Sequence, residues 1–267
     1  MVEYRGYGDS DNVTPNEAGL KIDAEAALRF VHDHVLLDSS QIFIFGRSLG
    51  GAVAFHLAQY FEQQQHQYAN MEVVGVIVEN TFLSISHMVD QLMPLVAPVK
   101  GFVLRIGWNS LHIAPTLKAP ILYLAGANDQ LVPHSHMLEL YKLSCKASRL
   151  ARLHVVENGT HNETWMQGGQ KYWDRIARFL AQVKALPTKS PGHTTGQLSL
   201  SSMSDVSLGN EPIAATKAGT STTVHMGDAS APPLSSAGIS IMPTSLMNMA
   251  KEAVCMTTTT ANNKKKE

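Results

Sequence analysis

The chain has 267 residues, of which 44% are hydrophobic, and its formal net charge is −1. This content suffices for a sizeable core, and the near-neutral charge argues against nucleic acid or an acidic membrane as the main partner. The two cysteines exclude a disulfide framework and a four-cysteine zinc site, and no metal or cofactor motif is found.

Strand-like and helix-like segments alternate along the first 185 residues. The expected strands are short apolar runs at 41–45, 73–78, 121–125 and 152–156. Runs of this kind are typical of strands buried on both faces of a parallel sheet. Helical spacing is found over 16–35, 49–61, 134–144 and 163–183. The alternation predicts an α/β fold, a mostly parallel sheet with helices on both faces.

Two further expectations concern the helices. In the first helix, Ala18, Ile22, Ala26, Phe30 and Val31 are expected to form the buried face. The region 82–113 is irregular, and prolines at 94 and 98 interrupt any long helix there. We expect short helices in this region, forming a small cap.

The motif Gly46-Arg47-Ser48-Leu49-Gly50 follows an expected strand and opens an expected helix. This is the G-x-S-x-G nucleophile elbow in its strand–turn–helix context. Ser48 is therefore the candidate nucleophile, and the backbone N–H of Leu49 is the candidate oxyanion donor at the helix N-terminus. A chance glycine-rich turn is the alternative interpretation, whereas a phosphate loop would need a lysine that is missing here.

The acid and the base should follow the serine in the order Asp or Glu, then His. Asp129 comes just after the strand at 121–125, at the sheet edge where α/β folds bind ligands. A helix-capping role for Asp129, and Glu79 as a rival acid, are the alternatives. His161 lies in the loop before the last helix, and His134, His136 and His154 lack that placement. The sequence predicts a Ser48–His161–Asp129 triad that acts through an acyl-enzyme.

The composition changes near residue 186. Residues 186–267 are dominated by Ser, Thr, Gly, Pro and Ala, with no aromatic residue. Such a segment cannot bury enough apolar surface to offset its ordering entropy. We predict a hydrolase domain over 1–185 and a low-complexity disordered tail over 186–267.

Four segments resemble one family, in order along the chain. They are residues 4–8 (YRGYG), 45–54 (FGRSLGGAVA), 78–84 (VENTFLS) and 159–165 (GTHNETW). Over residues 4 to about 183 the chain is similar to the α/β-hydrolase domain-containing protein 13 group, the bud-emergence-type hydrolases. The resemblance implies an α/β-hydrolase fold, a serine hydrolase whose triad maps onto Ser48, Asp129 and His161, and membrane attachment through an N-terminal segment. Related depalmitoylating hydrolases suggest a lipid ester or thioester, on a small molecule or an acylated protein, as substrate.

The chain departs from that family at its start. In such hydrolases several strands precede the tyrosine–glycine loop, and one ends in a His-Gly turn that donates the second oxyanion N–H. No His-Gly pair precedes Ser48, and no apolar run long enough to cross a bilayer or serve as a signal peptide is found. We expect an N-terminally truncated chain, soluble as written, with its localisation left open. The absence of the strand that would lie beside the nucleophile strand would expose a long apolar edge of the sheet.

Three alternatives to an esterase-type enzyme stay open. Because removing one oxyanion donor typically lowers the rate by about 10²–10³, a catalytically impaired chain acting as a binding scaffold is the first. A serine peptidase is the second, since peptidases share this fold and triad. The third is an interaction protein that works through the Ser- and Thr-rich tail.

Overall fold

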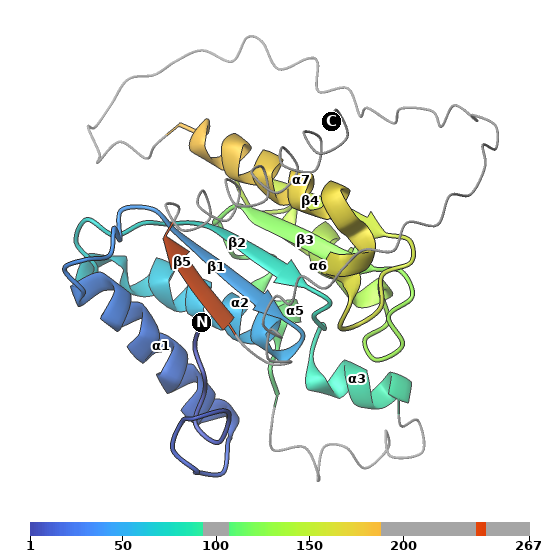
Figure 1. Ribbon diagram of the computed structural model, residues 1–267, viewed down its shortest axis with the longest axis horizontal. Coiled ribbons are helices and arrows are strands. Elements are labelled where there is room, and N and C mark those ends of the chain that lie inside the picture. The colour runs from blue at the N-terminus through green and yellow to red at the C-terminus, as the bar shows by residue number, and fades with distance from the viewer. Residues whose placement is uncertain (93–106, 188–238, 244–267) are drawn as a thin grey trace, which may run out of the picture. The chain divides into compact units, whose positions relative to one another are not determined.

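The structure is a computed structural model that describes residues 1–92, 107–187 and 239–243. Its five-stranded sheet has the order β4-β3-β2-β1-β5 (Figure 1). The first four strands are parallel, and β5 pairs antiparallel with β1. Their bounds are β1 Ile42–Arg47, β2 Val73–Glu79, β3 Ile121–Gly126, β4 Ala151–Val156 and β5 Ile239–Pro243.

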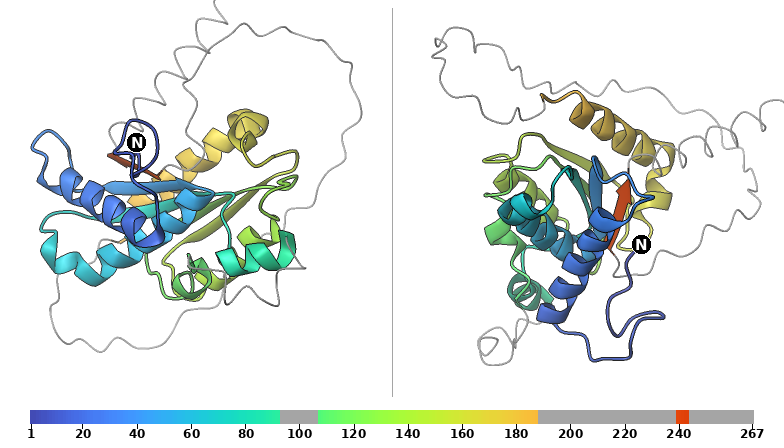
Figure 2. Two further views of the ribbon diagram at one scale, coloured as in Figure 1. Left: turned by 90° about the horizontal axis from the view of Figure 1, so that it is seen from below. Right: turned by 90° about the vertical axis from the view of Figure 1, so that its left-hand side faces the viewer.

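Helices cover both faces of the sheet. The described helices are α1 Glu17–Asp33, α2 Leu49–Gln64, the 3₁₀ turn Gln65–Gln67, α3 Ile85–Leu92, α5 Ser110–Ile113, α6 Ser135–Ser144 and α7 Thr164–Lys184. Helix α7 lies on one face, and α1 and α2 lie on the other (Figure 2). The predicted α/β architecture, a mostly parallel sheet with helices on both faces, is confirmed.

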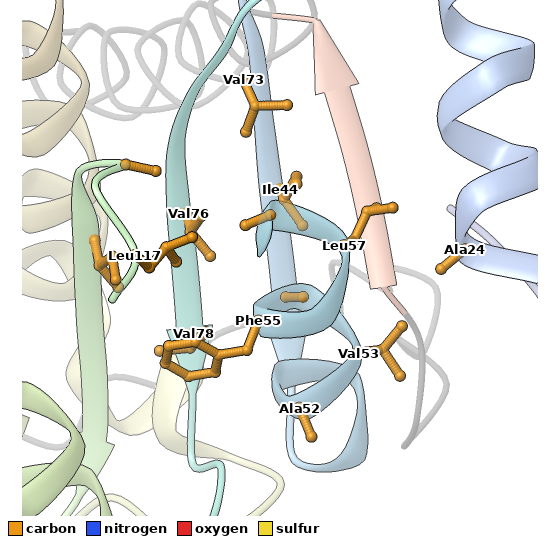
Figure 3. Packing of buried hydrophobic residues seen from close by; sticks show 14 of the residues in the cluster. Ala24, Ile44, Ala52, Val53, Phe55, Leu57, Val73, Val76, Val78 and Leu117 are labelled. Carbon is orange, nitrogen blue, oxygen red and sulfur yellow. The ribbon is translucent and has the colours of Figure 1, made fainter. Parts of the chain in front are cut away.

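The larger core lies between α2 and the sheet. Phe55 of α2 points toward Val78 of β2 (Figure 3), and Leu57 of α2 belongs to the same buried cluster as Ile44 of β1 and Val76 of β2. The second core joins α7 to the opposite face, where the rings of Phe43 and Phe179 meet edge-on with centroids 6.3 Å apart. Burial of both faces explains why the central strands are apolar throughout.

The predicted buried face of α1 was wrong except at Val31. The structure buries Leu20, Ala24, Leu28 and Val31, whereas Ala18, Ile22, Ala26 and Phe30 are exposed. Both sets recur every four residues, so helical period alone cannot choose between them. The packing against the rest of the fold decides between them, because Leu20, Ala24 and Leu28 lie in one buried cluster with residues of α2.

The two edges of the sheet also differ from expectation. Strand β4 is only half-buried, with Val156 alone fully buried, because it forms an outer edge. At the other edge β5 comes from the segment predicted as a disordered tail. An uncovered β1 would present unpaired N–H and C=O groups, and an added antiparallel strand satisfies them. The remaining tail residues, from 188 on, lie outside the described ranges, so the division at 185 stays a prediction.

Helix α7 contains a sharp backbone change. Gly169 has φ 50° and ψ −141°, which separates the first turns of the helix from its longer second part. A side chain at this position would meet no atom within 4 Å, so the positive φ alone requires glycine. The second part carries Tyr172, Ile176 and Phe179 into the core, while the first part follows the loop that holds His161.

Two leucine-to-alanine substitutions, one at a buried and one at an exposed position, test the packing of α2. We expect Leu57→Ala to lower the free energy of unfolding by about 2–5 kcal/mol, because it leaves a cavity against the sheet. Leu36→Ala is the matched control, since 84% of that side chain is exposed, and its expected change is within about 0.5 kcal/mol. Urea unfolding followed by circular dichroism measures both. Equal effects of the two substitutions would contradict the described packing.

Candidate active site

Ser48 sits in a strained turn between β1 and α2. Its φ of 53° and ψ of −121° lie outside the ordinary regions for a residue with a side chain. The turn is possible because strand and helix approach closely at glycines. A Cβ on Gly46 would lie 2.1 Å from the carbonyl oxygen of Gly50, and one on Gly51 would lie 2.5 Å from the Cβ of Thr81. The glycines therefore allow the elbow to form.

His161 contacts both of the other predicted triad members. Its Nε2 lies 3.0 Å from Ser48 Oγ, and its Nδ1 lies 2.7 Å from Asp129 Oδ2. The side chains of His161 and Asp129 are 9% and 1% exposed, so little solvent reaches the imidazole–carboxylate pair. The structure brings together three residues separated by up to 113 positions in the chain. Their catalytic roles stay a prediction.

Asp129 is held by backbone amides on its other oxygen. Oδ1 accepts hydrogen bonds from the N–H groups of Leu131 and Val132, both at 2.8 Å. These bonds orient the carboxylate so that Oδ2 faces the imidazole. The alternative in which Asp129 merely caps the next helix does not fit, because α6 begins at Ser135 and His134 occupies its N-cap position.

Glu79, the rival acid, points to a different partner. The carboxyl group is 1% exposed, and its Oε2 accepts a 2.5 Å hydrogen bond from the Tyr172 hydroxyl of α7. Burial raises the pKa of Glu79 to about 7, against the opposing effects of the Tyr172 hydrogen bond and the Arg47 charge. Burial and the nearby Glu79 charge raise the pKa of Tyr172 well above its usual value. The imidazole Nδ1 of His161 bonds Asp129 instead.

Two further side chains reach the His161 loop, and the sequence analysis missed both. Arg47 donates from Nη1 to the carbonyl of Asn162 at 3.1 Å, and Asn80 donates from Nδ2 to the carbonyl of His161 at 3.0 Å. Arg47 ends β1 and Asn80 directly follows β2. Their place at strand ends was the available signal, because polar side chains there lie on the edge that carries Ser48.

Leu49 is the first residue of α2. The first N–H groups of a helix have no partner within it, so the Leu49 N–H is free of intrahelical bonding at the position next to Ser48. Its role as an oxyanion donor stays a prediction.

A groove of about 460 Å³ lies between α3 and α6. Leu83 and His136 both line it, and the Leu83 N–H donates to His136 Nδ1 at 3.3 Å. Two residues before Leu83, the Thr81 hydroxyl donates to the Ser48 carbonyl at 2.8 Å. The segment from Thr81 to Leu83 therefore contacts both the elbow and the groove. No triad residue lines the groove. The predicted cap falls largely on residues 93–106, outside the described ranges.

Comparison with known families supports the same interpretation of the fold. The prolyl oligopeptidase family matches residues 21–186, which is more than half of the chain. The chain belongs to the prolyl oligopeptidase family. By family and fold it is an α/β hydrolase.

Curated relatives confirm the predicted resemblance to the bud-emergence-type hydrolases. The chain is 34% identical to the α/β-hydrolase domain-containing protein WAV2 of Arabidopsis thaliana, over 67% of this chain and 59% of that protein. It is also 34% identical to protein bem46 of Schizosaccharomyces pombe, over 68% of this chain and 57% of that protein. The chain therefore spans less than two thirds of the length of these relatives.

Solved structures show the fold alone. An α/β hydrolase from Vibrio vulnificus matches with a TM-score of 0.53 and 22% identity, over 66% of this chain and 61% of that chain. None of the described helices is long and apolar enough to cross a bilayer.

The buried Glu79 of this prolyl oligopeptidase family member predicts a pH-dependent stability. Because its pKa rises from 4.5 to about 7 on folding, the folded state binds the proton more tightly. The stabilisation is complete below pH 4.5 and is lost as the pH rises through about 7. In Glu79→Gln we expect the fall in unfolding free energy across this window to shrink by on the order of 3 kcal/mol.

Urea unfolding at a series of pH values measures this difference. Glu157→Gln is the control, since Glu157 also follows the end of a strand but is exposed. If Glu79→Gln kept the wild-type pH dependence, Glu79 would not carry the buried proton.

Proposed function

We propose that the chain is a serine hydrolase in which Ser48 is the nucleophile, His161 the general base and Asp129 the acid. The observation that carries the proposal is the double contact of one imidazole, 3.0 Å to the serine oxygen and 2.7 Å to the carboxylate. These distances are within the reach needed for proton transfer.

The chemistry proceeds in two half-reactions. Ser48 Oγ attacks the substrate carbonyl while His161 Nε2 takes its proton, and Asp129 holds the imidazole tautomer and stabilises the imidazolium. The Leu49 N–H faces the oxyanion, and the leaving group departs with the proton from His161. Water then loses a proton to His161 and attacks the acyl-serine. The acyl–Oγ bond breaks, His161 returns the proton to Ser48 Oγ, and the acid is released.

An ester or thioester of a lipid-like acyl group, on a small molecule or an acylated protein, is the proposed substrate class. The support for it comes from the depalmitoylating hydrolases that are related to the bud-emergence-type hydrolases, which this chain resembles. Membrane association through a further segment belongs to the same proposal.

A peptidase is the second candidate function. The match to the prolyl oligopeptidase family favours it, because that family is named for a peptidase. The triad chemistry is the same for an amide and an ester, so the substrate alone separates the two candidates.

Labelling by a fluorophosphonate probe tests the nucleophile. We expect wild-type protein to be labelled at Ser48. Ser48→Ala is expected to show no labelling and a kcat lower by a factor of about 10⁶. Ser135→Ala is the matched control, because Ser135 is also at a helix N-terminus and is exposed. No labelling of folded wild-type protein would contradict the enzyme and support the impaired scaffold.

Substitution of the acid tests the role of the carboxylate. We expect Asp129→Asn to keep the fold and lower kcat by about 10⁴, because the amide favours the wrong imidazole tautomer. Asp33→Asn is the control, since Asp33 also lies 2.7 Å from a histidine Nδ1, that of His32, but its side chain is 65% exposed and has no described contact with the triad. A full-rate Asp129→Asn variant would contradict the assignment of the acid.

A substrate panel separates the two candidate functions. Rates for acyl esters and thioesters of increasing chain length are compared with rates for proline-containing peptides, with Ser48→Ala as the background. We expect the ester and thioester rates to exceed the peptide rates. The opposite order would replace the esterase proposal with the peptidase.

A further inference from the structure

We infer that Asn80 is a positioning residue that holds the His161 loop against the ends of the sheet, so that the imidazole reaches Ser48 and Asp129 together. The inference rests on the proposed function, because it assigns a role in bringing that triad into place. Asn80 touches no triad side chain in the described contacts and acts through the backbone of the base.

The Asn80 amide joins two segments that are distant in sequence. Its Nδ2 lies 3.2 Å from the Thr160 carbonyl, 3.0 Å from the His161 carbonyl and 2.9 Å from the Thr164 hydroxyl. Its Oδ1 accepts a 2.8 Å hydrogen bond from the N–H of Gly126, the last residue of β3. One side chain therefore connects the ends of β2 and β3 to the loop after β4.

The amide orientation follows from this set of partners. Reversing the amide would place the NH₂ group against the Gly126 N–H and the oxygen against acceptors. Only the observed orientation satisfies the buried groups on both sides. Asn80 is 1% exposed, so water does not compensate for a lost bond.

Thr164 completes the arrangement on the loop side. Its hydroxyl donates a hydrogen bond to the Thr160 carbonyl at 2.6 Å and accepts one from the Asn80 amide. Thr164 is the first residue of α7 and is fully buried. One hydrogen bond therefore joins the two ends of the loop from Thr160 to Thr164, which contains His161. Three further contacts join this loop to Asn80.

The backbone of Asn80 is also unusual. Its φ is 46°, a conformation in which asparagine is favoured over most other side chains, and its N–H donates to the Leu124 carbonyl of β3 at 3.1 Å. This turn directs the side chain to the loop immediately after the strand. A glycine would keep the backbone and remove only the amide, which makes the contribution of the amide separable.

Position matters here because His161 has to satisfy two geometries at once. A displacement of about 1 Å can lower a rate by about 10² when reacting groups lose alignment. Loss of the Asn80 hydrogen bond to the His161 carbonyl is therefore expected to lower the rate of the chemical step. The affinity for substrate is expected to stay nearly unchanged.

Two substitutions at Asn80 test the inference in the full 267-residue chain. Asn80→Gly removes the amide, and Asn80→Asp keeps its shape but replaces the donor with an oxygen that faces acceptors. Fluorophosphonate titration counts active sites, and kcat per titrated site is measured with an acyl ester. We expect a fall of about 10–100-fold in kcat with KM within about threefold.

Asn70 supplies the matched control. It also has a positive φ, 62°, but is exposed at the start of the segment before β2. Asn70→Gly and Asn70→Asp are expected to keep wild-type kcat and KM. Thermal unfolding of every variant shows whether the chain is folded at the assay temperature.

Thr164 provides the rescue test. Thr164→Ser keeps the hydroxyl and is expected to retain kcat within about threefold, whereas Thr164→Val removes it and is expected to lower kcat as the Asn80 variants do. In the Asn80→Gly/Thr164→Val double variant the two losses are expected to be less than additive, because both remove one connection.

The outcomes are distinguishable. Asn80 variants that lose stability but keep wild-type kcat per titrated site would overturn the inference and leave the proposed function in place. An equal loss in the Asn70 variants would also overturn it. Wild-type protein that neither labels at Ser48 nor turns over any ester or peptide would overturn the proposed function, and the inference with it.

Discussion

The parallel direction of four strands is the constraint on which the site depends. Because β1 to β4 run the same way, their carboxyl ends meet at one edge of the sheet: the last residues pair between β1 and β2 and between β3 and β4, and β3 extends two residues beyond the end of β2. Each segment that leaves this edge brings one polar group with it: Ser48 after β1, Asn80 after β2, Asp129 after β3 and His161 after β4. Residues that are far apart in sequence are thereby placed within hydrogen-bond distance, and the apolar cores on both faces hold the strands in that register.

Most of the parallel sheet could be predicted because its signal is local. An apolar run followed by Gly46-Arg47-Ser48 identifies a strand and the turn after it without knowledge of distant contacts. The face of α1 could not be predicted this way, because Ile22 and Phe30 repeat with the same period as Leu20 and Leu28. Strand β5 could not be predicted either, since its pairing with β1 uses backbone groups of segments about 200 residues apart.

The same contrast applies within the site. Asp129 and His161 were identifiable from their order in the chain and their place after strands. The roles of Glu79 and Asn80 were not, although they are neighbours after one strand, because the side chains of adjacent residues leave the backbone in different directions. Glu79 turns to Tyr172 of α7, and Asn80 turns to the loop of His161. Only the packing of α7 and the turn at Asn80 decide which partner each one meets.

The change of direction at Gly169 separates two demands on α7. Beyond it the helix is aligned by Phe179 and its neighbours, which have to match the twist of the sheet. Before it a short piece continues from Thr164 and has to match the position of the imidazole. With a joint between them, a sequence change that re-seats the long part on the sheet need not tilt the loop. The core and the edge that carries His161 can therefore change separately, although one helix belongs to both.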